Sequence, residues 1–121
     1  MIHKNLEMAY KAMAMVKSVE EKRREDYLRT VRGLGSMIIG NGIAATLLFL
    51  KKKGFDEAIK HLDELIGLKA DMKDFSARIF SESMTNKSLT AAEYLNAQLA
   101  AIDGASWLKR YAEIYFGGDK K

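Results

Sequence analysis

One stretch, residues 36–54, constrains the fold more than any other part of the chain. Between Ile43 and Leu50 every residue except Thr46 is apolar. A helix on the surface of a protein needs a polar face, which this run lacks. A helix that crosses a membrane needs about 20 apolar residues, so the run is also too short to span a bilayer. The sequence therefore predicts a helix that is buried among other helices.

The residues that flank this run are typical of helix ends. The side chain of Asn41 can cap free backbone N–H groups, and Gly42 tolerates a non-helical backbone. Lys51–Lys53 place positive charge near the negative end of the helix dipole, and Gly54 is the residue type that most often follows a helix. We therefore expect a buried central helix at residues 43–53.

Apolar periodicity predicts further helices on both sides of this one. No stretch shows the period-two alternation that is typical of strands. The expected fold is therefore an all-α, single-domain bundle of about five to six helices. The predicted helices cover residues 2–19, 26–40, 43–53, 55–68 and 89–116, with a short helix within 69–80 and a loop over Ser81–Ser88.

Two of these helices carry more specific signals. Thr90 and Glu93 form a capping box before the last helix, whose apolar face continues past Asp103-Gly104 and so favours one long helix. We expect its aromatic residues to lie in the core. Glycines at 33 and 35 are expected to kink or end the second helix. They do not form a nucleotide-binding loop, because no strand precedes them and the required Lys and Ser/Thr are missing.

Length and composition limit the class of protein. The 121 residues suit one domain with a real core, expected at residues 1–116, followed by a disordered tail at 117–121. The absence of proline leaves long helices uninterrupted. The absence of cysteine excludes disulfides and thiolate chemistry and is consistent with a reducing compartment. With no membrane-spanning run and no signal-peptide core, we expect a cytoplasmic protein.

The sequence offers no convergent set of catalytic groups. Glu57, His61 and Glu64 share one helix face and could hold a metal ion, but no second cluster completes such a site. A solvated face with charge partners is the simpler interpretation. We therefore expect no metal, no cofactor and no enzymatic activity. A pocket with carboxylates gathered around His61 would favour an enzyme instead.

Two patterns together resemble the small helical subunit of type III-B CRISPR–Cas effector complexes, the Cmr complexes. The first runs M-I-x-x-N-G-I-A-x-T-L-x-F-L over residues 37–50, followed by lysines and a glycine. The second is a tyrosine followed, after twelve residues, by W-L-K-R-Y-A-E at 107–113. Members of this family often have proline where this chain has Gly35. The signature residues, which we also expect in or near the core, are Ile38, Asn41, Gly42, Ala44, Thr46, Leu47, Phe49, Leu50, Tyr94, Trp107 and Leu108.

The resemblance implies a non-catalytic subunit of an antiviral ribonucleoprotein complex. Several copies would stack into a minor filament beside the backbone filament that carries the crRNA. Cleavage of target RNA would belong to the backbone subunit, and signalling and DNase chemistry to the large subunit. The implied partners are those two subunits, other copies of this chain, crRNA and target RNA, with no membrane and no small-molecule substrate. A stand-alone helical module that binds another protein through its Met- and Ala-rich first helix is the alternative.

A subunit that lies along an RNA duplex needs Lys and Arg aimed at phosphates, and the net charge of +4 permits this role. The candidate side chains could equally be solubilising charges. If the second and third helices are antiparallel, their basic residues could form one patch. The RNA-binding candidates are Lys22, Arg23, Arg24, Arg29, Arg32, Lys51, Lys52, Lys53, Lys109 and Arg110.

Overall fold

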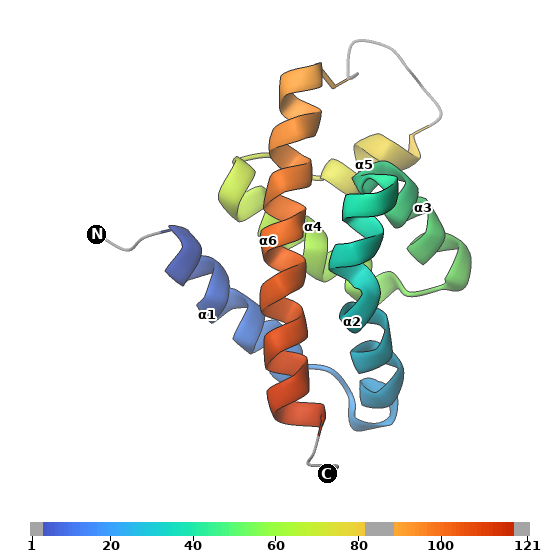
Figure 1. Cartoon of the computed structure of the whole chain (residues 1–121), viewed down its shortest axis with the longest axis vertical. Coiled ribbons are helices and arrows are strands. Elements are labelled where there is room, and N and C mark those ends of the chain that lie inside the picture. Colours follow the sequence, from blue (N-terminus) through green and yellow to red (C-terminus); the bar gives the residue numbers. More distant parts are fainter. Residues whose placement is uncertain (1–3, 82–88, 118–121) are drawn as a thin grey trace.

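The computed structural model describes residues 4–81 and 89–117, and all regular structure within these ranges is helical (Figure 1). This confirms the predicted all-α fold. None of these helices is long and apolar enough to cross a membrane. The elements are α1 (Lys4–Lys17), the 3-10 turn η1 (Glu21–Arg23), α2 (Arg24–Asn41), α3 (Ile43–Lys53), α4 (Asp56–Ala70), α5 (Phe75–Phe80) and α6 (Ala91–Phe116).

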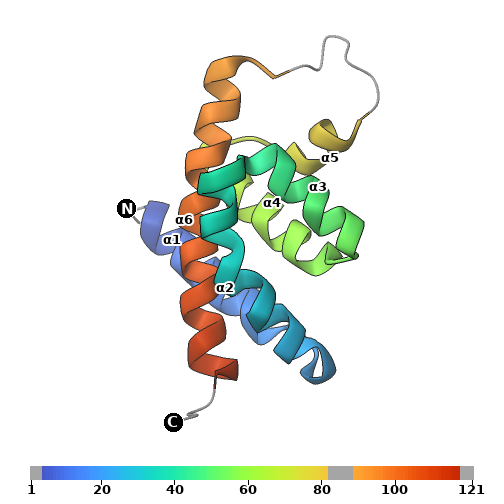
Figure 2. The ribbon, with the colours of Figure 1, turned by 45° about the vertical axis from the view of Figure 1, so that its right-hand side comes forward.

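The helix α6 is the element on which the others pack. Figures 1 and 2 show it running the length of the molecule, with α1, α2 and α4 packed along it. The predicted capping box is present, since the Thr90 side chain accepts from the Glu93 N–H and the Glu93 side chain accepts from the Thr90 N–H. The helix continues past Gly104, where an added Cβ would lie 3.1 Å from the Leu65 side chain of α4. The missing side chain at Gly104 therefore lets α4 pack close to α6.

The helix α3 is buried on one face only. Ile43, Leu47 and Leu50 are fully buried, as the sequence predicts. On the opposite face, however, Leu48 is 52% exposed and Phe49 is 38% exposed. Figure 1 shows α3 beside α2 at the edge of the bundle rather than at its centre. The expectation that α3 is surrounded by other helices was wrong, because an apolar run does not determine how many helices pack around it.

The helix α2 does not end at Gly33 or Gly35, where a kink or an end was expected. It begins at Arg24 and ends at Asn41, and the structure leaves open space around a Cβ added at Gly33 or Gly35. Burial of Val31 and its neighbours on the inner face offsets the low helix propensity of these glycines. Figure 2 shows that α2 bends along its length but does not end.

The Met- and Ala-rich face of α1 lies in the core. Met8, Ala12 and Val16 are fully buried. This confirms the core interpretation of that face and removes it as a free surface for a partner protein.

Between α4 and α6 the structure agrees in part with the prediction from the sequence. The short helix predicted within 69–80 is present as α5, and its Phe75 is fully buried. The helix α4 passes Gly67 and ends at Ala70, where Asp71 takes a left-handed conformation with φ 57°. Most of the predicted loop over Ser81–Ser88, and the predicted tail beyond Gly117, lie outside the described residues.

Candidate nucleic-acid interface

The turn between α2 and α3 is capped from α6. Gly42 has φ +89° and ψ 158°, a conformation that residues with a Cβ rarely adopt. The first N–H groups of α3 find acceptors on α6: the N–H of Ile43 donates to Oε1 of Gln98 at 3.0 Å, and that of Ala44 donates to the Tyr94 hydroxyl at 3.0 Å. The two acceptors therefore fix where α3 starts relative to α6.

The expectation that Asn41 caps α3 was wrong. Asn41 is the last residue of α2 and is exposed, and Gly42 occupies the capping position without a side chain. The polar residue inside the apolar run has a local partner instead, because the hydroxyl of Thr46 donates to the carbonyl oxygen of Gly42 at 2.8 Å. Thr46 is therefore fully buried with its hydrogen bond satisfied.

Three of the predicted RNA-binding residues, Arg24, Arg29 and Arg32, line one groove between the start of α2 and the end of α6. We call this the arginine groove. Its volume is about 1170 Å³, and Tyr115 and Phe116 of α6 form part of its wall. The side chains of Glu21, Glu25 and Glu113 also border it. The fold thus brings together cations that lie on successive turns of α2.

Contacts on both sides hold two of these arginines in place. Nε of Arg24 donates to the carbonyl oxygen of Val19 at 3.1 Å, and its guanidinium carbon lies 5.1 Å from the ring centre of Phe116. Nε of Arg32 donates to Oε2 of Glu113 at 3.1 Å. These contacts orient each guanidinium and use few of its five N–H donors.

The third arginine is held within its own helix. Nη1 of Arg29 lies 2.9 Å from Oδ1 of Asp26, and its Nη2 lies 3.7 Å from a carboxylate oxygen of Glu25. Both pairs are exposed, so each contributes little to stability. A phosphate can compete for such a guanidinium, because a planar fork of donors matches phosphate oxygens as well as carboxylates.

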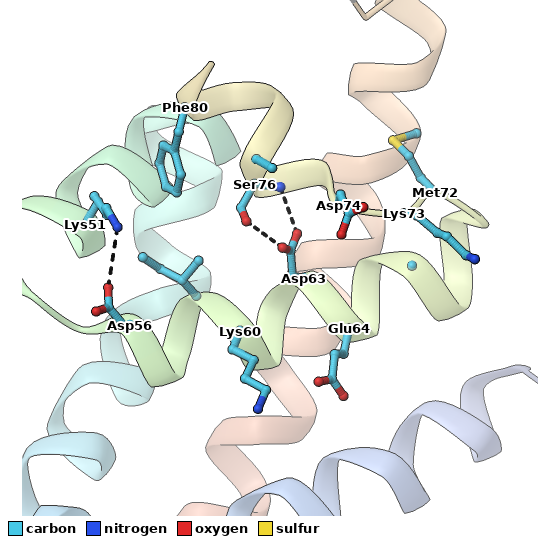
Figure 3. A pocket seen from close by; sticks show the side chains of 13 residues that line it. Lys51, Asp56, Lys60, Asp63, Glu64, Met72, Lys73, Asp74, Ser76 and Phe80 are labelled. Atoms are coloured by element: carbon cyan, nitrogen blue, oxygen red, sulfur yellow. Dashed lines mark hydrogen bonds and ion pairs between the residues drawn. The ribbon is translucent and has the colours of Figure 1, made fainter. Parts of the chain in front are cut away.

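Lys51, near the end of α3, lines a different hollow (Figure 3). Its volume is about 590 Å³, and it lies beside α4 and α5. Lys51 reaches toward Asp56, with 4.0 Å between Nζ and Oδ1, and its Nζ lies 5.7 Å from the ring centre of Phe80. Asp63 accepts hydrogen bonds from both the backbone N–H and the hydroxyl of Ser76. Carboxylates outnumber lysines around this hollow, so its charge disfavours a polyanion, whereas arginines and glutamates are equal in number around the arginine groove.

The other predicted cations are spread over the surface. Lys22 and Arg23 are exposed in η1, and Arg23 lies 3.6 Å from Glu20. Lys52 and Lys53 are exposed at the end of α3, and Lys109 and Arg110 are exposed on α6. The single patch that was expected to join Arg29 and Arg32 to Lys51–Lys53 is therefore divided, because Lys51 and the two arginines line separate hollows.

His61 does not belong to a solvated face. It is only 4% exposed, and its Nδ1 lies 2.7 Å from the hydroxyl oxygen of Tyr27 on α2. Burial lowers the pKa of His61 to about 4, so the imidazole is neutral at neutral pH. Glu64, which shares its helix, pairs instead with Lys11 of α1 at 3.6 Å. Among the described residues, no three His, Asp or Glu side chains are placed to hold a metal ion.

A comparison with known protein families identifies the family of this chain. The model of a family described as "CRISPR-associated protein (Cas_Cmr5)" matches residues 3–115. The chain belongs to this family. A relative from Thermotoga maritima, "CRISPR system Cmr subunit Cmr5", is 45% identical over 116 residues, which are 96% of this chain and 87% of that protein. No solved structure matches significantly.

The residues on which the predicted signature rests lie in the core, at the cap of α3 and on the surface. Gly42 and Tyr94 form the cap, whereas Asn41 and Phe49 are exposed. Gln98 completes the cap, and the sequence pattern does not reveal this role because its partner lies 55 residues away. The remaining signature residues are Ile38, Thr46, Leu47, Leu50 and Leu108, which are fully buried, and Ala44 and Trp107, which are half-buried.

Replacing Tyr94 with Phe should lower the free energy of unfolding by about 1 kcal/mol, because the N–H of Ala44 loses its acceptor while the ring stays in place. Urea unfolding followed by circular dichroism measures this change. Tyr10→Phe is the control, because Tyr10 is exposed on α1 and its hydroxyl caps none of the helices that the structure describes. Equal free energies for the two variants would contradict the capping role of Tyr94.

Proposed function

We propose that this chain is the non-catalytic small subunit of a type III-B effector complex, in which it supplies basic surface along the guide–target RNA duplex. Copies of the chain would stack into a minor filament beside the backbone and large subunits. The relationship to a Cmr subunit supports membership of the complex. The observation that carries the RNA part of the proposal is the convergence of Arg24, Arg29 and Arg32 on one groove.

The chemistry of the groove suits a ligand that is recognised without its sequence. Guanidinium groups contact phosphates of any sequence, and such contacts position a protein on nucleic acid without reading bases. The carboxylates beside the arginines orient them in the absence of RNA. Each phosphate contact releases counterions, so binding that depends on the groove should weaken steeply with salt.

A double variant, Arg29→Gln with Arg32→Gln, tests this proposal in the assembled complex. Neutral glutamines remove two phosphate contacts without placing new negative charge beside Glu113. We expect weaker retention of RNA, and a salt-dependence slope that is shallower by about one for each phosphate that the protein no longer neutralises. The measurement is RNA bound to purified complex across a salt series.

Lys51→Gln with Lys52→Gln is the matched control, because it removes the same charge from the last turn of α3, where Lys51 lines the other hollow. We expect it to retain more RNA than the arginine double variant. Unchanged retention by the arginine variant, or an equal loss in both variants, would remove the arginine groove from the proposal. Co-purification of crRNA and other Cmr subunits with a tagged wild-type chain tests membership of the complex separately.

A further inference from the structure

Three aromatic rings form a stack along α6. Trp107, Tyr111 and Tyr115 lie one helical turn apart, and successive ring centres are 6.1 Å apart with interplanar angles of 22° and 13°. We call these three residues the aromatic ladder. They were expected in the core. Trp107 and Tyr111 are half-buried and pack against it, whereas Tyr115 is 39% exposed. The neighbouring Ile114 is 67% exposed, so this side of α6 faces outward.

A cation lies over the ring at each end of the aromatic ladder. The guanidinium carbon of Arg110 is 5.1 Å from the ring centre of Trp107, and Nζ of Lys17 on α1 is 5.4 Å from that of Tyr115. Neither cation forms an ion pair with a carboxylate in the part of the chain that the structure describes. The surface therefore combines one exposed and two half-buried aromatic rings with two cations that form no ion pair within the described ranges.

The aromatic ladder is continuous with the arginine groove. Tyr115 is the last ring of the ladder and also lines the groove beside Arg24 and Arg32. At a rise of 1.5 Å per residue, the ladder extends about 12 Å along α6 from that point. A ligand whose charged part occupies the groove can thus reach the rings without a break in the surface.

We propose that this combined surface binds a single-stranded segment of RNA, with phosphates in the arginine groove and unpaired bases against the aromatic ladder. The inference rests on the proposed function and refines its ligand. Bases inside a duplex are already stacked and paired, so a duplex offers the groove only its phosphates. Unpaired bases can stack on aromatic side chains, and flanking cations strengthen such a platform for any base sequence.

The fluorescence of Trp107 tests the proposal directly, because it is the only tryptophan of the chain. Oligouridine of about ten nucleotides, a length typical of single-strand binding sites, is titrated into the whole chain at low salt. We expect quenching of the fluorescence on binding. Tyr115→Leu should weaken binding about tenfold, since one base–ring stack contributes roughly 1–3 kcal/mol. Tyr115→Phe keeps the ring and should bind within about twofold of wild type.

The control is Phe49→Leu, because Phe49 is exposed to the same extent as Tyr115 and also has a lysine, Lys53, over its ring at 5.8 Å. It lies on α3, away from the ladder, and should leave oligouridine binding unchanged. Thermal unfolding of each variant shows whether the fold is kept. A duplex with the same number of phosphates should quench Trp107 far less.

Three results would overturn the proposal: no quenching of the wild-type chain, equal affinities of wild type and Tyr115→Leu, or equal quenching by duplex and single strand. Dissociation of Cmr subunits from a Tyr115→Leu complex, with oligouridine affinity unchanged, would assign the ladder to a protein contact instead. None of these results affects the test of the arginine groove in the assembled complex, so failure here is distinguishable from failure of the proposed function.

Discussion

Replacing Gly42 with Ala should lower the free energy of unfolding by about 3 kcal/mol. Part of this effect is backbone strain, because φ +89° with ψ 158° is accessible to glycine but not to alanine. The rest comes from the cap of α3. An added Cβ would lie 3.2 Å from the Tyr94 hydroxyl and 3.5 Å from Oε1 of Gln98, the two acceptors that hold the first turn. Urea unfolding followed by circular dichroism gives the free energy.

Gly40→Ala is the control, and we expect it to change the free energy of unfolding in the opposite direction. Gly40 lies in the last turn of α2, it is exposed, and no atom approaches within 4 Å of a Cβ added there. Alanine should therefore stabilise the protein by up to about 1 kcal/mol through its higher helix propensity. If both alanine variants shift stability in the same direction, the special role of the Gly42 turn is contradicted.

The second large effect is a decrease of stability in acid that originates at His61. Burial lowers its pKa to about 4 in the folded protein, against 6.5 in the unfolded chain. Between these values the unfolded chain binds more protons, so stability falls as the pH falls. The contribution of His61 is fully present above pH 6.5 and has disappeared by about pH 4. Its size is on the order of 3 kcal/mol.

A comparison of wild type with His61→Gln isolates this contribution. The variant keeps a polar side chain that can accept from the Tyr27 hydroxyl, but it does not titrate. The slope of unfolding free energy against pH should therefore be shallower in the variant between pH 6.5 and 4. Tyr27→Phe removes the hydroxyl and keeps the burial, so it should be less stable yet retain the wild-type slope. Identical slopes for wild type and His61→Gln would show that His61 is not the titrating group.

Features that depend on neighbouring residues were predictable from the sequence. The capping box of α6 involves residues three apart, and Gly54 ends α3 in a left-handed conformation, as its position after three lysines indicates. The continuity of α6 past Gly104 followed from the unbroken spacing of its apolar residues. Each of these signals lies within a few residues, where helix geometry determines what a side chain can reach.

Features that depend on distant partners were not predictable. Asn41 is a better capping residue than Gly42 by type, yet α3 takes its cap from Tyr94 and Gln98 on α6. Likewise, His61 was expected on a charged face, because its partner, Tyr27, lies on another helix and its burial could not be foreseen. The residue type determines which hydrogen bonds a side chain can form, whereas the fold determines which partners lie beside it.

The same distinction applies to the candidate interface. Composition indicated which side chains could contact phosphate, but not how they are grouped. Arg29 and Arg32 face the end of α6, whereas Lys51 faces α4 and α5, so one predicted patch became two surfaces. The aromatic ladder had a visible signal in the spacing of Trp107, Tyr111 and Tyr115. Core packing and surface stacking produce the same spacing, so only the degree of burial separates them: Tyr115 is exposed, whereas Trp107 and Tyr111 are half-buried.

The position of α6 in the chain has a consequence for biosynthesis. A ribosome makes α1, α2 and α4 first, and each of these helices packs on α6, which follows them all. Until α6 has left the exit tunnel, the apolar faces that it will cover have no partner, and α3 lacks the acceptors on Tyr94 and Gln98. The bundle therefore cannot complete its folding before α6 has been synthesised, and a nascent chain that stalls before residue 91 presents an open core to chaperones and proteases.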